Sequence, residues 1–294
     1  MADGTRIGAA GSTVGEAVRA AADRLRTAGV DTPDLKADFW ISHVLGCTRL
    51  ELPLQSPDEL DADSRDRISL GLERLCRHEP LQYVEARADF MGRPFYVDPR
   101  VLIPRPETEQ LVEMVLDTPG AWPENGAVIA DVGTGSGCIV VSLALARPCA
   151  SLVATDLHED ALAVARGNAE RHGVADRIEF RQTSLLEGVA AESLDVVVSN
   201  PPYVATCELD GLPREVREYE PCSALDGGPD GLDLVRMLAK QAHNRLKPAG
   251  HLFVEIGETQ GSPVRALLED AGFDQVAIGR DLAGRVRMAG GRKA

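Results

Sequence analysis

The chain has 294 residues, enough for two domains of ordinary size, and a formal net charge of −15. Hydrophobic residues make up 44% and charged residues 26%, which is typical of a globular protein. Affinity for nucleic acid comes mainly from Lys and Arg on phosphates, so the negative charge opposes such binding. We therefore expect a protein or small-molecule substrate and no direct contact with nucleic acid.

The six cysteines form no Cys-x-x-Cys pair and do not cluster with the six histidines. We therefore expect no metal site and predict reduced, buried thiols, as in a cytoplasmic protein. The first residues lack the apolar segment of a secretory signal, and no apolar run reaches the length of a membrane span. We expect a cytoplasmic protein without membrane contact, and we predict a disordered tail over residues 1–12.

Residues 13–88 carry helical patterns and predict a small N-terminal helical domain. Thr13 and Glu16 have the spacing of a capping box at the start of a helix that ends before Gly29. Further helices are predicted over residues 33–45 and 62–77, from apolar residues at helical spacing. Residues 89–106 contain Gly92 and several prolines, which indicates a hairpin or an extended linker.

From residue 107 to residue 294, short β-rich runs alternate with helical patterns. Strands are predicted over residues 127–131, 151–156, 178–181, 194–199 and 251–256, and helices over 138–147, 159–172 and 230–246. This alternation predicts an α/β domain with a mainly parallel sheet covered on both faces. Ligands of such sheets bind at the carboxyl ends of the strands.

A glycine-rich turn follows the first of these strands and opens a helix. Its Gly-x-Gly-x-Gly spacing differs from the Gly-x-Gly-x-x-Gly of dinucleotide-binding proteins. The turn predicts a close backbone approach to a ligand, and its residues are Asp131, Gly133, Thr134, Gly135, Ser136 and Gly137. Asp156 ends the next strand, where an acidic residue can accept the hydroxyls of a ribose. A helix cap or turn aspartate is the structural alternative for Asp156.

The sequence Asn200-Pro201-Pro202-Tyr203 directly follows the apolar strand 194–199. An amide nitrogen is a poor nucleophile, and a site assists it by accepting hydrogen bonds from its N–H groups. The Asn200 side-chain carbonyl and the Pro201 backbone carbonyl are suitable acceptors, so we predict that both are catalytic. Tyr203 can pack against a planar amide or base. A proline-rich turn without function is the alternative.

With these motifs, the chain resembles the release-factor glutamine methyltransferase family (HemK/PrmC) over nearly its whole length. The segments that carry the resemblance are 80–83, 90–92, 101–109, 131–137, 200–203, 220–228, 246–248, 255–257, 260–261 and 281–285. The resemblance implies a Rossmann-like class I domain, dependent on S-adenosylmethionine (SAM), after an N-terminal helical bundle. It also implies a protein-glutamine N5-methyltransferase. Its substrate would be the glutamine of the Gly-Gly-Gln motif in class I peptide-chain release factors, and S-adenosylhomocysteine its product.

The resemblance also implies roles for single residues. The glycine loop would border the methionine part of the cofactor, Asp156 the ribose and Leu185 the adenine. Asn200 would border the cofactor and, with Pro201, Pro202 and Tyr203, hold the substrate glutamine. The N-terminal domain would contact the release factor, and we expect a monomer.

Four residues depart from the family pattern. Ser184 stands where an acidic residue is common, Val286 replaces an aspartate, and Ala86 and Ala249 replace glycines. These departures leave open a related enzyme that N-methylates a small-molecule amide or amine. A methyltransferase acting on amino groups of nucleic acid and a non-catalytic binding module are further alternatives, against which the net charge and the intact motifs argue respectively.

Overall fold

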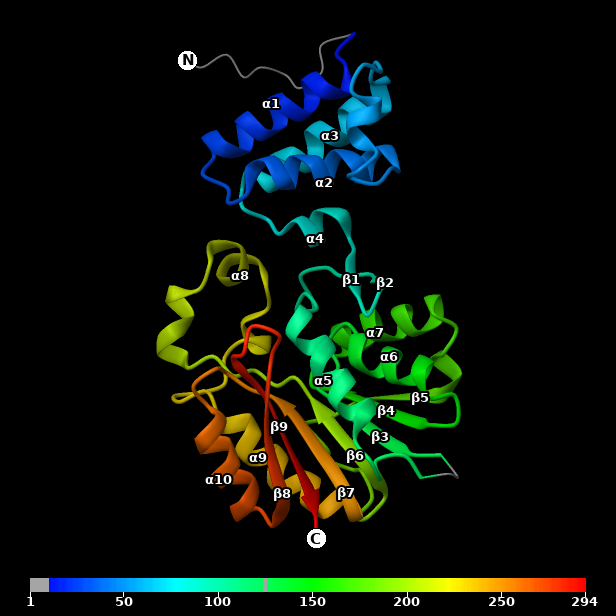
Figure 1. Ribbon diagram of the computed structural model, residues 1–294, viewed down its shortest axis with the longest axis vertical. Coiled ribbons are helices and arrows are strands. Elements are labelled where there is room, and N and C mark those ends of the chain that lie inside the picture. Colours follow the sequence, from blue (N-terminus) through cyan, green and yellow to red (C-terminus); the bar gives the residue numbers. More distant parts are fainter. Residues whose placement is uncertain (1–10, 124–125) are drawn as a thin grey trace. The chain divides into compact units, whose positions relative to one another are not determined.

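The computed structural model describes residues 11–123 and 126–294 (Figure 1). The chain separates into two compact units, Met1–Arg87 with Arg214–Tyr219, and Ala88–Pro213 with Glu220–Ala294. Residues 1–10 of the predicted tail lie outside the described residues. The carbonyl of Ser12, the last residue of that segment, accepts a hydrogen bond from the Leu60 N–H at 3.0 Å.

The first unit consists of helices that pack around one apolar core. These are α1 (Val14–Thr27), α2 (Pro33–Leu45), the 3-10 turn η1 (Leu52–Gln55), α3 (Ala62–Leu75), α4 (Leu81–Glu85) and, from a later part of the chain, α8 (Arg214–Tyr219). The predicted capping box is confirmed, since Thr13 and Glu16 exchange backbone-to-side-chain hydrogen bonds of 3.0 and 3.3 Å. The fully buried core includes Leu25, Ile41, Ile68, Leu72 and Leu75.

Helix α8 belongs to the first unit through two contacts, although its residues follow the Asn200–Tyr203 segment in the chain. Glu215 forms a 2.7 Å ion pair with Lys36, and the Tyr219 hydroxyl donates a hydrogen bond to the carbonyl of Arg77 at 2.7 Å. The segment that leaves the second unit after Pro213 therefore returns to it at Glu220.

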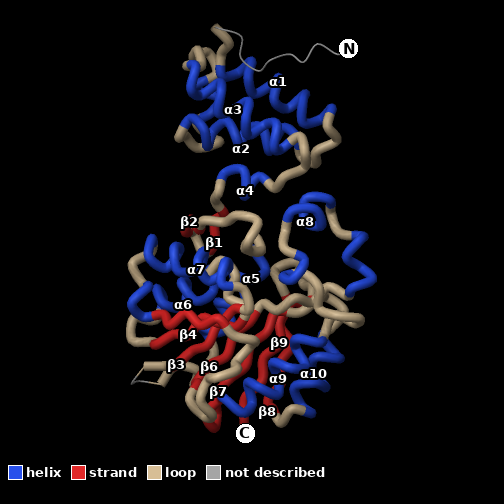
Figure 2. Tube along the Cα trace, turned by 180° about the vertical axis from the view of Figure 1, so that it is seen from behind, coloured by secondary structure: helices blue, strands red, loops and turns tan. Residues whose placement is uncertain are grey.

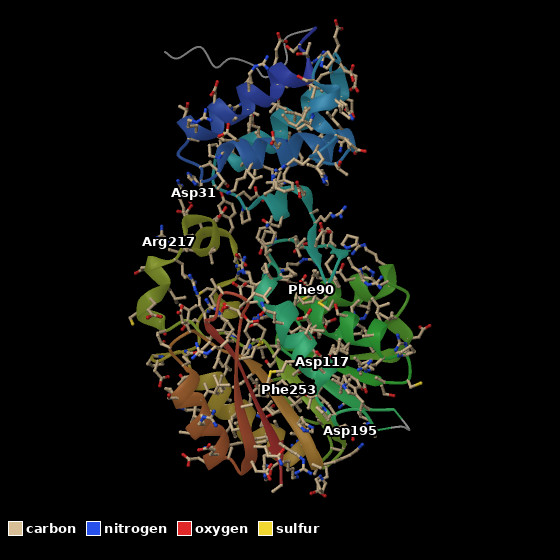
Figure 3. All side chains as sticks on the ribbon, in the orientation of Figure 1. Asp31, Phe90, Asp117, Asp195, Arg217 and Phe253 are labelled. Atoms are coloured by element: carbon tan, nitrogen blue, oxygen red, sulfur yellow. The ribbon has the colours of Figure 1, made fainter. Side chains whose placement is uncertain are left out.

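The second unit begins with the predicted hairpin, formed by β1 (Ala88–Phe90) and β2 (Arg93–Phe95). Its turn residues Met91 and Gly92 both have positive φ, and the Met91 N–H donates to the carboxylate of Glu109 at 2.6 Å. Phe90, labelled in Figure 3, packs edge to face on Phe95 in the core.

A seven-stranded sheet forms the centre of the second unit, in the order β5-β4-β3-β6-β7-β9-β8. The first five strands of that order run parallel, and β9 is antiparallel to both of its neighbours. The strands are β3 (Val128–Val132), β4 (Ser151–Asp156), β5 (Ile178–Gln182), β6 (Leu194–Ser199), β7 (Leu246–Glu255), β8 (Phe273–Arg280) and β9 (Val286–Lys293). The parallel strands were predicted, whereas β8 and β9 were not.

Helices cover both faces of the sheet (Figures 1 and 2). On one face lie α5 (Pro106–Asp117), α6 (Cys138–Ala146) and α7 (Glu159–Arg171), and on the other α9 (Asp233–Arg245) and α10 (Gly261–Asp270). Short 3-10 turns are η2 (Ala175–Arg177), η3 (Thr206–Gly211) and η4 (Cys222–Ala224). Alternate strand residues enter the two cores, with Phe253 (Figure 3) on the α5 face and Leu252 on the α9 face.

The strand order determines where a ligand can enter. From β3 the chain proceeds outward to β4 and β5, and then crosses back to β6 on the other side of β3. The loops after β3 and β6 therefore diverge at the carboxyl edge, which is where open α/β sheets bind ligands. The glycine turn follows β3 and Asn200 follows β6, so the topology brings both predicted motifs to this edge.

All six cysteines are free thiols, but the prediction that they are buried was wrong for most of them. Only Cys138 is buried, Cys47 and Cys76 are partly buried, and Cys149, Cys207 and Cys222 are exposed. Within the described residues, no helix has the length and apolar character needed to cross a membrane.

Candidate active site

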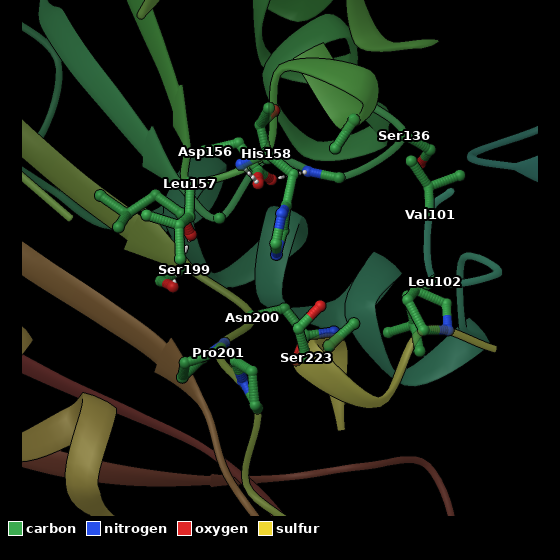
Figure 4. A pocket seen from close by; sticks show the side chains of 18 of the residues that line it. Val101, Leu102, Ser136, Asp156, Leu157, His158, Ser199, Asn200, Pro201 and Ser223 are labelled. Carbon is green, nitrogen blue, oxygen red and sulfur yellow. Dashed lines mark hydrogen bonds between the residues drawn. The ribbon is translucent and has the colours of Figure 1, made fainter. Parts of the chain in front are cut away.

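One cavity opens at the carboxyl edge of the sheet and gathers most of the predicted site residues (Figure 4). Of the residues predicted from sequence, those lining it are Gly133, Thr134, Gly135, Ser136, Asp156, Leu185, Asn200, Pro201 and Pro202. Asp131, Gly137 and Tyr203 do not line it. The segments 101–104, 156–158 and 221–224 also contribute to its lining.

The glycine loop is attached to the end of β4. The N–H groups of Gly133 and Thr134 both donate to the carbonyl of Thr155 at 2.9 Å. Gly133, Gly135 and Gly137 all have positive φ, between 53° and 79°, which glycine adopts without steric cost. A Cβ at Gly133 would meet no atom within 4 Å, whereas one at Gly137 would lie 3.0 Å from the Ala165 Cβ. Gly133 therefore faces open space, and Gly137 allows close packing of the loop on α7.

Asp131 lies beneath the glycine loop and is completely buried. Its Oδ2 accepts hydrogen bonds from the Thr134 hydroxyl at 2.7 Å and from the Val140 N–H at 3.2 Å. Burial raises the pKa of this carboxyl to about 7. Asp131 thus links the end of β3 to the loop and to the first turn of α6, and contributes to the cavity through the loop it supports.

Asp156 stands at the end of β4 and faces the cavity (Figure 4). One carboxylate oxygen accepts the Gly135 N–H and the other accepts the His158 N–H, both at 3.0 Å. Each carboxylate oxygen has a second acceptor position. Asp156 is therefore a turn aspartate by its present contacts and retains acceptor positions toward the cavity, so the two interpretations made from the sequence are compatible.

Leu185 and Ser184 lie side by side in the cavity lining, in the loop after β5. Leu185 has a positive φ of 51°. The loop is held at both ends, because the Thr183 N–H donates to the carbonyl of Asp156 at 2.9 Å and the Leu186 N–H donates to Gln241 at 2.9 Å.

Asn200 directs its side chain into the cavity (Figure 4). Its Nδ2 donates to the hydroxyl of Thr108 at 3.1 Å, and that hydroxyl donates to Glu255 at 2.6 Å. Thr108 and Glu255 are 2% and 1% exposed. One N–H of the Asn200 amide is thereby bonded within the protein, and its carbonyl oxygen is available to accept a hydrogen bond from a ligand.

Pro201 and Pro202 continue the cavity lining, whereas Tyr203 is not among the lining residues and is half-buried; its burial raises its pKa to about 12. The carbonyl of Tyr203 accepts a 2.9 Å hydrogen bond from the side chain of Gln260. Gln260 is fixed in turn by the Gly257 N–H at 2.8 Å. The structure therefore places Tyr203 behind the cavity lining, where it anchors the segment.

Glu220 joins two segments that line the cavity and was not recognised from the sequence as doing so. It is 5% exposed, accepts the Ile103 N–H at 3.1 Å and pairs with the guanidinium of Arg105. Residues 101–104 and 221–224 are thus held together by one buried carboxylate. Both segments belong to the motifs that carry the family resemblance, but nothing in their spacing along the sequence indicated that they lie next to each other.

Asn168 is a further residue that sequence reasoning missed. Although it lies on α7, it is fully buried and donates to the carbonyls of Tyr96 and Ser136 at 2.9 and 2.8 Å, while its oxygen accepts the Tyr96 N–H at 2.8 Å. It therefore connects the segment after the hairpin to the glycine loop. A polar residue on the apolar face of a predicted helix was the available signal.

His158 is a further cavity residue. It lies in the exposed loop after β4, and its ring points into the cavity (Figure 4). The sequence carried no signal for this position, because the direction of the loop depends on the carboxylate of Asp156.

Two solved structures with a similar fold are methyltransferases. A methyltransferase from Pyrococcus furiosus has a TM-score of 0.52 at 18% identity and covers 69% of this chain and 90% of its own. The T. thermophilus 16S rRNA N2 G1207 methyltransferase, in complex with AdoMet and guanosine, has a TM-score of 0.50 at 16% identity, with 71% and 50% covered. These likenesses confirm the predicted class I methyltransferase fold.

Sequence comparison identifies the family. The model of the PrmC N-terminal domain matches residues 16–84, and that of the methyltransferase small domain matches residues 108–211. The release factor glutamine methyltransferase of Koribacter versatilis is 39% identical over 96% of this chain and 99% of its own length. That of Moorella thermoacetica is 42% identical over 93% and 95%. With both of its parts matched and a cavity built from its motifs, the chain belongs to the release factor glutamine methyltransferase family.

Proposed function

We propose that this protein transfers a methyl group from SAM to the side-chain amide nitrogen of the glutamine in the Gly-Gly-Gln motif of class I peptide-chain release factors. The observation that carries this proposal is the convergence of the glycine loop, Asp156 and Asn200 on one cavity. The names of relatives that match nearly the full length supply the substrate class.

The cavity fits the proposed cofactor. Gly133 faces open space, and the Ser136 hydroxyl oxygen is buried without a hydrogen-bond partner in the protein. Gly133, Thr134, Gly135 and Ser136 would hold the methionine part, Asp156 would accept the ribose hydroxyls, and Leu185 would offer an apolar surface to the adenine. Asp131 and Gly137 would act through the shape of the loop. When bound, SAM supplies an electrophilic methyl group on a sulfonium centre.

Asn200 and Pro201 would orient the attacking nitrogen. The Asn200 carbonyl oxygen and the Pro201 backbone carbonyl would each accept one N–H of the substrate amide, which directs the nitrogen toward the methyl group. Such positioning supplies most of the acceleration in transfers of this kind. The proton that the amide loses on methylation can pass to water. Pro202 and Tyr203 would shape the segment around the substrate amide.

The first unit would bind the release factor, since residues 16–84 match the N-terminal domain model of this family. We propose that the protein acts as a monomer in the cytoplasm, where release factors serve the ribosome, and that it does not bind nucleic acid directly. Light scattering of the protein alone and with a release factor would test the stoichiometry.

Mass spectrometry of a class I release factor, incubated with this protein and SAM, would test the proposed function. We expect a gain of one methyl group on the Gly-Gly-Gln glutamine and no gain in a release factor with Glu in place of that Gln. The Asn200→Ala enzyme should lose nearly all turnover while its affinity for S-adenosylhomocysteine changes little. If the wild-type protein binds S-adenosylhomocysteine but leaves the release factor unmethylated, the substrate is a different amide or amine.

A further inference from the structure

The amide of Asn200 can be inserted in two ways, and only one of them suits the proposed chemistry. A side-chain amide has a hydrogen-bond acceptor on one side and two donors on the other. With its oxygen toward the cavity, the Asn200 amide accepts a hydrogen bond from an N–H of the substrate. With its nitrogen toward the cavity, the N–H groups of Asn200 and of the substrate would face each other, and neither could accept. The structure must therefore contain a group that selects one orientation.

Thr108 and Glu255 form a directional chain that makes this selection. A hydroxyl has one proton to donate, and an ionised carboxylate only accepts. The Thr108 hydroxyl therefore gives its proton to Glu255 at 2.6 Å and keeps its lone pairs for the Asn200 Nδ2 at 3.1 Å. The direction of the first hydrogen bond thus determines the direction of the second.

The sheet supplies the three residues from separate elements. Ser199 and Val254 are register partners in the parallel strands β6 and β7, so Asn200 and Glu255 are neighbours at the carboxyl edge. Thr108 comes from the first turn of α5, which begins at Pro106. Thr108 and Glu255 are almost fully buried, so water cannot readily replace the hydrogen bond between them.

We propose that Thr108 and Glu255 are positioning residues that fix the Asn200 amide with its oxygen toward the substrate nitrogen. This inference rests on the proposed function, because the required orientation follows from an amide substrate. Thr108 lines the cavity, whereas Glu255 is not among the residues that line it; the proposed role of each is exerted through Asn200.

The protonation of Glu255 adds a second consequence. A protonated Glu255 can donate to Thr108, whose own proton then turns toward Asn200 and favours the opposite orientation of the amide. Burial raises the pKa of Glu255 to about 7. The titratable and charged groups that act on it are Glu107 of α5, Tyr203 after β6, Arg287 of β9 and Cys138 of α6, and the Thr108 hydroxyl donates a hydrogen bond to it. Turnover should therefore rise with pH through this range, and this rise should be absent in Glu255→Gln.

A matched pair of variants tests the proposal. Thr108→Val keeps the shape of the side chain without its hydroxyl, and Thr108→Ser keeps the hydroxyl. We expect Thr108→Val to lower kcat for release factor methylation about 100-fold, the order of loss seen when a reacting group is misplaced. Its affinity for S-adenosylhomocysteine should stay close to wild type, and Thr108→Ser should recover most of the activity. A Val variant with wild-type kcat, or a Ser variant as slow as Val, would overturn the proposal.

A readout without substrate separates this inference from the proposed function. In protein labelled with ¹⁵N-asparagine, the Asn200 side-chain amide protons are identified by their loss in Asn200→Ala. We expect one of them to exchange slowly with water in the wild type and in Thr108→Ser, and rapidly in Thr108→Val. Equal exchange in all three proteins would refute the hydrogen-bond chain. If the Asn200 amide proton of the wild type exchanges slowly but the protein methylates no release factor, the proposed function fails, while the hydrogen bonds from Asn200 through Thr108 to Glu255 are supported.

Discussion

Two glycines of the same loop should respond differently to a single added methyl group. Gly133 and Gly137 have positive φ angles of 70° and 79°. Alanine at such a φ destabilises the folded state by about 1–2 kcal/mol. It also lowers the conformational entropy of the unfolded chain, which stabilises the protein by about 0.4–1 kcal/mol. Gly133→Ala should therefore lower the free energy of unfolding by about 1 kcal/mol.

Gly137→Ala carries an additional cost because its Cβ would approach the Ala165 Cβ at 3.0 Å and the Ala165 Cα at 3.1 Å. Overpacking of this kind typically costs about 1–3 kcal/mol, so the total loss should be about 2–4 kcal/mol. In a Trp40→Phe background, the fluorescence of Trp122 reports urea unfolding of the second unit alone.

Ligand affinity should show the opposite order. The methyl group at Gly133 would project into open space beside the cavity, so Gly133→Ala should weaken S-adenosylhomocysteine binding more than Gly137→Ala does. Calorimetric titration measures both affinities. Equal losses of stability in the two variants would refute the argument from close packing on α7.

Four further changes test other parts of the site. Asp156→Ala should weaken S-adenosylhomocysteine binding by about 1–3 kcal/mol, the value of a hydrogen bond to a charged group; unchanged affinity in calorimetry would contradict its proposed contact with ribose. The Glu255 pKa rises from 4.5 to about 7 on folding, so its proton stays bound in the folded state and the free energy of unfolding falls as pH rises between these values. The fall is at most about 3 kcal/mol, and Glu255→Gln should show a shallower decline between pH 5 and pH 8 in urea titrations. Ala249→Gly should raise the free energy of unfolding by about 0.5–1 kcal/mol, because Ala249 has a φ of 66°; a loss of stability on urea unfolding would show that this strain is absent. Ser184→Asp should tighten S-adenosylhomocysteine binding by about 1 kcal/mol if a carboxylate accepts the adenine amino group, and calorimetry showing weaker binding would place the adenine elsewhere.

The inner parallel strands β3, β4 and β6 could be predicted from sequence because they are buried on both faces. Their residues form nearly continuous apolar runs, and β4 and β6 begin and end where the pattern placed them. Strand β9 gives no such signal, since its sequence Val-Arg-Met-Ala-Gly-Gly-Arg-Lys neither alternates nor stays apolar. Its position depends on pairing with β7 and β8, which a local pattern does not contain.

The same distinction separates the predicted site residues from the missed ones. The glycine loop and Asn200 belong to motifs that are contiguous in the chain, so their spacing is visible. Glu220 and Arg105 are 115 residues apart, and Thr108 and Glu255 are 147 apart. Their hydrogen bonds exist only because the sheet order brings β6, β7 and the start of α5 to one edge. The residues proposed to touch a ligand could be identified from local sequence, whereas the residues proposed to orient them required the fold.

The structure also gives the departures from the family pattern a physical meaning. Ala86 and Ala249 have φ angles of 53° and 66°, so glycine is the favoured residue at both positions and alanine there lowers the stability of the fold. Val286 begins β9 and packs against Gly261. Only Ser184 lines the cavity, beside Leu185 and apart from the Asn200–Pro202 segment in the chain. The departures that motivated a small-molecule substrate therefore lie at strained backbone positions, at a packing contact and at the proposed cofactor site, and none replaces a residue proposed to hold the glutamine.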